Sequence, residues 1–450
     1  MLEIFAGSLF TEVSALLILA GMIGLAGHML KQPLVVSYIL VGIVAGPSVL
    51  NLAQSEGSLE LLSELGIAIL LFLVGLKMDF KLIRSLGAVS LTTGLGQVIF
   101  TAAFGFMISY LLGFGLIPSI YIAVALTFSS TIIIVKLLSD KRELDSLHGR
   151  TALGFLIVQD IVVVLAMVAL STIGMGSGED GGEVTFSQAA IAAAALVGVV
   201  VLIVKFAATP ITKKLAENQE LLILFALGLA AGFAAIGEYL GLGLEIGGLL
   251  AGVALASTPY RESISSRLTT LRDFLLLFFF VVLGTELNLG ALGSNIPAAL
   301  LLSAFVLIGN PLIVLIIMGR MGYRKRTSFL AGLTVAQISE FSLIFVGMGV
   351  TLGHLTGSEL GLVTLVGLIT IAVSTYMITY SHQIYKLLEP YLGFAERDDP
   401  AREIQEEEKD KSTPPAVILL GLAGLGGAFA ARLMEKRYLP SVWTLIHPQW

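Results

Sequence analysis

A single aspartate interrupts one long apolar stretch of the chain. The run GRTALGFLIVQDIVVVLAMVAL at 149–170 carries Gln159 and Asp160 near its middle, with apolar residues on both sides. A carboxyl group among apolar side chains is costly to ionise, so it can hold a proton or, once ionised, offer oxygen ligands to a hard monovalent cation. The alternative is an aspartate that stays protonated or paired. We interpret Gln159, which is uncharged, as a supporting amide.

A cluster of hydroxyl side chains interrupts a second apolar stretch. The segment TFSST at 127–131 supplies Thr127, Ser129, Ser130 and Thr131. In one interpretation these hydroxyls line a helix break and bind an ion. In the other they hydrogen-bond to carbonyls one turn earlier, as is common in membrane helices.

A second acid, Glu340, lies in the segment QISEF, with Gln337 and Ser339 as accessory candidates. A carboxylate inside an apolar span is a functional candidate because of its cost. The alternative is a structural pair or a hydrogen bond to the interrupted backbone. Ser339 follows Ser130, and Glu340 follows Thr131, by the same 209 residues, so the two interruptions occupy equivalent positions.

The composition indicates that these polar residues lie in a membrane. Of 450 residues, 56% are hydrophobic and 13% are charged, against roughly 25% charged in an ordinary soluble domain. The mean hydropathy is +0.95, and apolar runs of about 18 to 25 residues recur, which predicts an all-helical, polytopic membrane protein. The net charge of −6 argues against nucleic acid as a partner. The absence of cysteine excludes disulfides and thiolate metal sites, and nothing in the sequence supports a metal-dependent enzyme.

The apolar runs predict about thirteen membrane spans before residue 387. They are expected at 9–30, 34–50, 60–76, 87–113, 116–138, 149–173, 187–211, 219–238, 241–257, 272–286, 296–319, 327–352 and 358–381. The start, MLEIF, has no basic region or cleavage site, so the first run is expected to remain in the mature protein.

Charge separates the connections between these spans into two sets. The connections at 51–59, 113–118, 174–186, 287–295 and 353–357 contain no Lys or Arg, whereas the alternate connections are basic. Because Lys and Arg stay in cytoplasmic loops, the N-terminus is predicted outside and the C-terminus in the cytoplasm. Glu245 then lies toward the outer half of its span, where it either lines an entry path or is solvated at the interface.

The chain also repeats its own pattern. ILLFLVGLKMDF at 69–80 aligns with FFFVVLGTELNL at 278–289, and GIVAG at 42–46 aligns with GLLAG at 248–252, at offsets of 209 and 206. Under the predicted topology, the matching spans run in opposite directions. Inverted repeats are typical of transporters, in which the substrate site lies near the bilayer midplane where interrupted helices meet.

Together these motifs resemble the monovalent cation:proton antiporter family, in its Kef-type potassium efflux and potassium exchange antiporter branch. The resemblance rests on FSST followed by VKLL, the Gln159–Asp160 pair, LGLGLEIGGLLAG and AQISEF, and it covers nearly all of 1–387. It implies an antiporter fold of about thirteen helices in two inverted repeats with crossed discontinuous helices, a homodimer, and an elevator-like movement of a core bundle. It further implies that Asp160 is the carboxylate for the ion and the proton, and that the Gln159–Asp160 form favours potassium.

Three features depart from that family. Many relatives carry a lysine in span eleven that pairs with the carboxylate, whereas this chain has Asn310 followed by Pro311. Relatives often have glycine where Ser339 stands, which argues against a fully unwound break there. The expected loop after span nine reads RESISSRLTTLRD, with Arg267 and Arg272 in place of an acidic gating stretch, so glutathione gating is not inferred.

The chain changes character after the transmembrane domain, 1–387. Residues 388–415 are charged and contain proline, which predicts a solvated linker. Residues 416–450 are expected to form a strand, a glycine-rich turn and a helix that resemble an incomplete Rossmann-like nucleotide-binding regulatory domain. Its fingerprint is imperfect, and the candidate nucleotide-binding glycines are Gly421, Gly424, Gly426 and Gly427. The alternative for 414–430 is another membrane segment.

We therefore predict a secondary active antiporter, not an enzyme, in a bacterial-type inner membrane. Potassium or sodium is exchanged for protons because both compete for Asp160, and transport requires no cofactor. One alternative is a gated, channel-like potassium efflux pathway without proton exchange on the same scaffold. Another is a membrane sensor that transports nothing.

Overall fold

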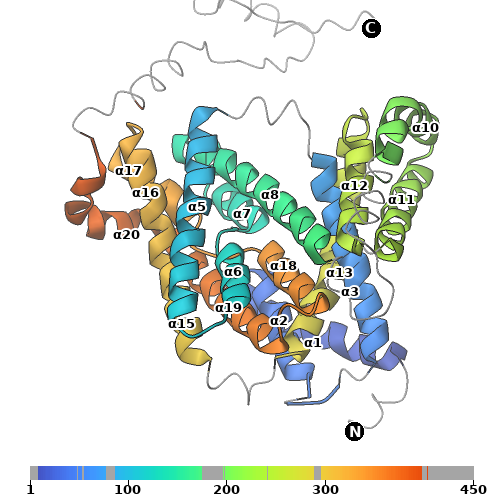
Figure 1. The fold of residues 1–450 in the computed structure, drawn as a ribbon, viewed down its shortest axis with the longest axis horizontal. Helices are drawn as coiled ribbons and strands as arrows, with labels where there is room; N and C mark the ends of the chain where they lie inside the picture. Colours follow the sequence, from blue (N-terminus) through green and yellow to red (C-terminus); the bar gives the residue numbers. More distant parts are fainter. Residues whose placement is uncertain are drawn as a thin grey trace, which may run out of the picture.

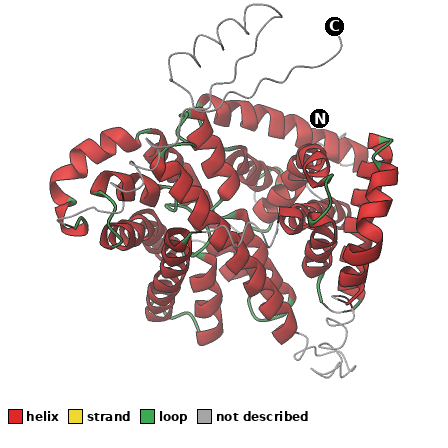
Figure 2. Ribbon diagram, turned by 90° about the horizontal axis from the view of Figure 1, so that it is seen from above, coloured by secondary structure: helices red, strands yellow, loops and turns green. Residues whose placement is uncertain are grey.

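The computed structural model describes residues 9–47, 49–52, 55–77, 87–174, 196, 198–240, 242–287, 295–397 and 403, and within them it is helical (Figures 1 and 2). Eight helices in this part of the chain are long and apolar enough to cross a membrane. Four further apolar helices are shorter. The chain is thus a multi-pass integral membrane protein.

The helices of the first half are α1 (Leu9–Met29), α2 (Leu34–Ala45), α3 (Glu56–Lys77), α5 (Ala88–Leu111), α6 (Leu116–Ala125), α7 (Thr131–Asp140), α8 (Leu147–Gly174), η2 (Ile203–Ala207) and α10 (Ala208–Leu215). Those of the second half are α11 (Gln219–Tyr239), α12 (Leu244–Ala256), α13 (Arg261–Thr285), α15 (Ile296–Ala304), η3 (Phe305–Gly309), α16 (Asn310–Arg320), α17 (Lys325–Leu333), α18 (Glu340–Thr351), α19 (Gly357–Thr379), α20 (Ser381–Leu388), η4 (Glu389–Tyr391) and η5 (Gly393–Ala395).

The described helices lie in the apolar runs, and two of the expected spans are interrupted at the places where the sequence offers a break. The spans expected at 116–138 and 327–352 are each divided into two half-helices, α6 with α7 and α17 with α18. The loop expected at 261–273 is wrong, because α13 begins at Arg261. Its first turns bury Ile264 and Leu268, one turn apart, so an apolar helical face packs there despite the surrounding charges. The span expected at 187–211 lies largely outside the described residues.

The described helices form two packed groups. One group joins α1, α2, α3, α11, α12 and α13, and the other joins α5, α6, α8 and α15 to α19. Figure 1 places α3 with α10 to α13 on one side, and α5 to α8 with α15 to α17 on the other. The predicted regulatory domain at 416–450, with Gly421, Gly424, Gly426 and Gly427, lies outside the described residues, as does most of the linker.

Glycine allows α3 and α12 to pack with their backbones in close approach. A Cβ at Gly252 would overlap the carbonyl oxygen of Phe72, and a Cβ at Gly75 would overlap that of Leu249. Small residues at helix contacts let the backbones come together, which is a common way of packing membrane helices. These two glycines therefore fix how closely α3 lies against α12.

Gly252→Ala is expected to destabilise the protein by about 1–3 kcal/mol, because overpacking forces helices apart. Thermal unfolding of the purified protein in detergent measures the change. Gly228→Ala is the matched control, since a Cβ at Gly228 meets nothing within 4 Å. Equal unfolding temperatures for the two variants would contradict the close-packing argument.

Candidate functional site: two helix breaks and a carboxylate cavity

Two interrupted helices meet in the interior of the protein. α6 ends at Ala125 and α7 begins at Thr131, while α17 ends at Leu333 and α18 begins at Glu340. The interruptions fall in the TFSST and QISEF segments. The hydroxyl of Ser342 in α18 donates to the carbonyl oxygen of Ala125 at 2.6 Å, which joins one break to the other. α6 and α18 lie side by side in Figure 1 and also contact each other.

Serine residues begin the second half-helix at both breaks. Ser130 precedes α7, and its hydroxyl accepts a hydrogen bond from the backbone N–H of Ile133 at 3.3 Å. Ser339 precedes α18 and accepts from the backbone N–H of Phe341 at 3.2 Å. Serine is a favoured N-cap because its side chain satisfies an N–H group without an intrahelical partner. Serine at position 339 is therefore compatible with an unwound break.

Asp160 lies against the start of α7. The hydroxyl of Thr131, the first residue of α7, donates to both carboxylate oxygens of Asp160, at 3.3 Å to Oδ1 and 3.1 Å to Oδ2. The N-terminal end of a helix carries a partial positive charge, which favours a nearby carboxylate. The break therefore compensates the aspartate through the hydroxyl and the helix end, although the aspartate is in an apolar helix.

Glu340 occupies the corresponding place at the start of α18. It is 4% exposed, and Ser339 donates to its Oε2 atom at 3.4 Å. Two carboxyl groups are thus held near the N-terminal ends of two half-helices. This arrangement favours negative charge at two points and so prepares a site for a cation or a proton.

A cavity of about 610 Å³ brings these groups together. Thr131, Asp160 and Glu340 line it on the side of the broken helices. The facing side carries charged and hydroxyl groups from α3 and α13: Lys77, Arg261, Glu262, Ser265, Ser266 and Arg272. Arg272 is paired with Asp273 at 2.6 Å. The cavity therefore lies between the two helix groups and contains charges of both signs.

Gln159 points into a separate network of amides. Its Nε2 donates to Gln97 Oε1 at 2.7 Å, and its Oε1 accepts from the backbone N–H of Ser129 at 3.1 Å. Gln97 in turn donates to Thr101 Oγ1 and to the carbonyl oxygen of Thr127, at 3.0 and 3.3 Å. Through these hydrogen bonds Gln159 holds the break in place from α8.

Asn310 reaches the same break from α16. It accepts from the hydroxyl of Thr101 at 2.8 Å and donates to the carbonyl oxygen of Leu126 at 3.3 Å. The last carbonyl groups of any helix lack intrahelical partners. Those of Ala125, Leu126 and Thr127 are satisfied instead by side chains of three other helices. The amide network thus stabilises the end of α6.

Only some of the predicted site residues line the cavity. Thr131, Asp160 and Glu340 line the cavity, whereas Asn310 and Glu245 are not among its lining residues. The remaining candidates lie at the breaks: Thr127, Ser129, Ser130, Gln337 and Ser339. Among them, the hydroxyl of Thr127 donates to the carbonyl oxygen of Val124, one turn earlier, at 2.6 Å. This is the bonding described by the second interpretation of the TFSST hydroxyls.

Two buried groups at the breaks have no hydrogen-bond partner among the described residues. They are the hydroxyl of Ser129 and the Nε2 atom of Gln337. Gln337 Oε1 accepts from the hydroxyl of Ser374 at 2.7 Å, so only its donor side is unpaired. A buried polar group without a partner is costly, and these two atoms are candidates to bind water or a small ion.

Three functional candidates were missed in the sequence. Gln97 and Thr101 are buried polar residues one turn apart in an apolar span, which is the same signal that singled out Asp160. Lys77, at the end of α3, also lines the cavity. In the sequence it belongs to a basic connection that indicates only the orientation of the chain in the membrane.

Comparison with known proteins identifies the family of the chain. The family profile described as "Sodium/hydrogen exchanger, transmembrane" matches residues 14–380. The chain is 29% identical over 365 residues to the "Iron transporter MagA" of Paramagnetospirillum magneticum, covering 80% of this chain and 82% of that protein. It is 26% identical to the "Putative cation/proton antiporter YbaL" of Escherichia coli, covering 96% of this chain and 78% of that protein.

A plant relative and a solved structure extend the comparison. The "K(+) efflux antiporter 4" of Arabidopsis thaliana is 26% identical over 79% of this chain, which spans 61% of that protein. The fold is similar to the sodium proton antiporter MjNhaP1 from Methanocaldococcus jannaschii at pH 8, with a TM-score of 0.60, 17% identity, and coverage of 86% of this chain and 99% of that one. At this identity the likeness concerns the fold alone.

Gln159→Leu is expected to lower the stability of the protein by about 1–3 kcal/mol for each buried group left without a partner. The groups are the Ser129 N–H and Gln97 Oε1. A double-mutant cycle with Gln97→Leu, followed by thermal unfolding, measures the coupling. The two changes should cost less together than the sum of the single changes. Strict additivity would mean that the two amides do not support each other.

Proposed function

Because the chain belongs to the sodium/hydrogen exchanger family, we propose that it exchanges a monovalent cation for protons across a membrane as a secondary active antiporter. The observation that carries this proposal is the carboxyl of Asp160, hydrogen-bonded to the first residue of a broken helix and exposed to a cavity that also holds Glu340. A relative named as a cation/proton antiporter supports the exchange, and one named as a potassium efflux antiporter supports potassium as the cation.

The exchange follows from competition for one carboxylate. With a proton bound, Asp160 is neutral and offers no charge to a cation. After the proton leaves, the ionised carboxylate is stabilised by the Thr131 hydroxyl and the start of α7. A cation then binds to the carboxylate oxygens, and the hydroxyl of Thr131 can turn an oxygen lone pair toward it. One carboxylate cannot bind a proton and a cation at the same time, so movement of the cation in one direction is coupled to movement of protons in the other.

Alternating access is proposed to be an elevator-like movement of the group with the broken helices against the group formed by α3, α12 and α13. The position of the cavity between the two groups supports this, because sliding along that boundary would carry Asp160 between the two membrane faces. The amide network would keep the breaks intact during the movement. We also propose that two copies associate as a homodimer, as in the family that the motifs resemble.

Contacts between the halves support the proposed inverted repeats. Thr101 and Asn310 are separated by the same 209 residues as Ser130 and Ser339, and they hydrogen-bond to each other. Residues related by a two-fold axis meet when they lie on it, which is the relation expected of inverted halves. The distribution of basic loops supports an outside N-terminus and a cytoplasmic C-terminus.

Reconstitution into liposomes with an internal pH-sensitive dye tests the proposal. Potassium, sodium and rubidium gradients of equal size are applied in turn, and each transported cation should move protons in the opposite direction. With Asp160 as the one carboxylate that exchanges, the rate should not depend on membrane potential. Potassium flux without proton movement would favour the channel-like alternative and contradict antiport.

Asp160→Asn is expected to reduce cation-driven proton movement to the level of protein-free liposomes. The side-chain amide of asparagine neither takes up a proton nor carries a negative charge that could compensate the charge of a cation. The variant should keep its elution volume and unfolding temperature, since asparagine has nearly the same shape. Glu245→Gln is the matched control, as it removes a half-buried acid that does not line the cavity. Retained exchange in Asp160→Asn would reject the site assignment.

A further inference from the structure

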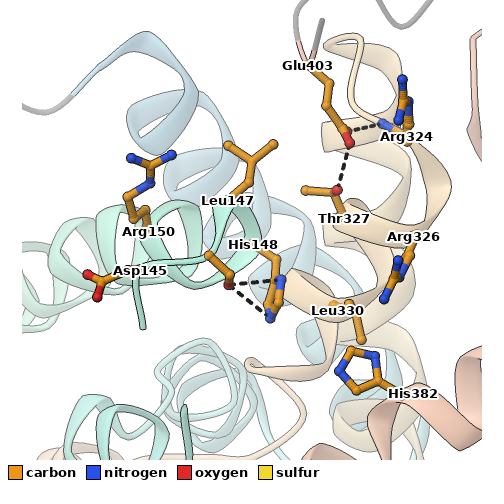
Figure 3. Close-up of a pocket in the computed structure, with 11 residues that line it drawn as sticks. Asp145, Leu147, His148, Arg150, Arg324, Arg326, Thr327, Leu330, His382 and Glu403 are labelled. Carbon is orange, nitrogen blue, oxygen red and sulfur yellow. Dashed lines mark hydrogen bonds between the residues drawn. The ribbon is translucent and has the colours of Figure 1, made fainter. Parts of the chain in front are cut away.

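A second pocket, of about 430 Å³, lies between the start of α8 and the start of α17 (Figure 3). Three arginines supply its positive charge: Arg150 from α8, and Arg324 and Arg326 from the start of α17. His148 from α8 and His382 from α20 also line it. The acids that line it are Asp145 and Glu403. Glu403 belongs to the segment that follows the transmembrane domain, so this pocket joins two membrane helices to the chain beyond them.

Both histidines are held on one wall of the pocket by Glu143. His382 Nε2 lies 2.7 Å from Glu143 Oε1, and His148 Nε2 lies 3.3 Å from Oε2. Lys141 pairs with the same carboxylate at 3.0 Å. Burial acts to raise the pKa of Glu143, but the hydrogen bonds from His382, Lys141 and His148 outweigh it, and its pKa is lowered. Glu143 is therefore ionised, and it holds both histidines in place on the side of the pocket that faces α17.

Glu403 is seated on the opposite wall through three hydrogen bonds. Its Oε2 accepts from the backbone N–H of Arg324 at 2.7 Å, and its Oε1 accepts from the hydroxyl of Thr327 at 3.1 Å. Its own backbone N–H donates to the carbonyl oxygen of Gly322 at 3.3 Å. The residue is 5% exposed, and Figure 3 shows its carboxylate directed at the start of α17.

The start of α17 has a specific need for such a carboxylate. Arg324, the N-cap residue, makes no capping hydrogen bond with its side chain. Arg324, Lys325 and Arg326 also place three positive charges where the helix end is already positive, which is unfavourable. Glu403 supplies an acceptor for the backbone N–H of this N-cap residue and the opposing charge. A residue 76 positions beyond Thr327 thus performs the part of the glutamate at the third helix position in a capping box, whose side chain accepts from the N-cap backbone N–H.

The sequence around Glu403 is suited to a basic surface. Residues 396–410 read ERDDPAREIQEEEKD, with eight acidic and three basic side chains. Opposite charges on a segment and a pocket draw the two together over distances longer than a hydrogen bond. The charge of the segment and the charge of the pocket are therefore complementary beyond the one residue that is seated.

We propose that the surface formed by the starts of α8 and α17 is a docking site for the acidic segment 396–410 of this same chain, with Glu403 as its anchor. α17 leads from this surface directly into the break that ends at Glu340. Docking thereby ties the chain beyond residue 403 to the helix that carries one half of the candidate ion site. The inference does not depend on the proposed exchange of cations, since it concerns the occupant of a separate pocket.

Hydrogen exchange of the full-length protein, followed by mass spectrometry, tests docking without any transport measurement. Glu403→Ala should accelerate exchange of the backbone amides in 322–328 by at least about tenfold, because the Arg324 N–H loses its acceptor and the first turn loses its cap. Exchange in α3 and α12 should stay unchanged, which monitors folding. Glu389→Ala is the matched control, since Glu389 pairs with Lys325 at 3.7 Å through its side chain only.

A synthetic peptide of residues 396–410, added to the Glu403→Ala protein, should restore slow exchange at 322–328. The same peptide with alanine at 403 should not restore it. Unchanged exchange in Glu403→Ala, or equal acceleration in Glu389→Ala, would overturn the anchoring role. Failure of the first peptide, or equal success of both peptides, would overturn the assignment of the surface to this segment.

Discussion

The structure depends on keeping one carboxyl group, that of Asp160, inside an apolar helix while leaving it accessible from a cavity. A carboxylate in a membrane interior is expensive unless nearby groups compensate its charge. Here the compensation comes from a hydroxyl and a helix end that exist only because the neighbouring helix is interrupted. The interruption in turn leaves backbone groups without partners. The interruption therefore lowers the free-energy cost of the buried charge, and other side chains must offset the free-energy cost of the broken helix.

The breaks are stabilised on the side away from the cavity. Gln97, Gln159 and Asn310 come from three helices and satisfy the end of α6 through a connected set of hydrogen bonds. The cavity side is different, since carboxyl and hydroxyl groups face open volume there, and charges from α3 and α13 lie opposite. The hydrogen bonds of Gln97, Gln159 and Asn310 hold the break on one side, and the charged cavity is open on the other. A small ion can therefore bind and leave without unfolding the break. The adjacent placement of Gln159 and Asp160 on α8 assigns one residue to each side.

Much of this was predictable from the sequence, and the reasons are local. Apolar run length predicted helices, and polar residues at equivalent positions 209 residues apart indicated the interruptions at TFSST and QISEF. Asp160 and Glu340 stood out because their types are rare in apolar runs. The sequence does not show which polar residues face the cavity. The orientations of the Asn310, Gln337 and Ser129 side chains depend on how the helices pack against one another. Gln97 and Thr101 were also missed, although they are buried polar residues one turn apart, because their contacts with Gln159, Thr127 and Asn310 depend on how the helices pack. A loop was expected at 261–273 because the charged residues there outnumber the apolar residues that α13 buries.

The most direct test of the central claim is the number of protons released when a cation binds to the purified protein. Calorimetric titration with potassium in buffers of different ionisation enthalpy gives this number near the pH at which Asp160 is protonated. If the proton and the cation share Asp160, close to one proton should leave for each cation bound, and the number should fall toward zero at higher pH. Cation binding that releases no proton at any pH would contradict the account.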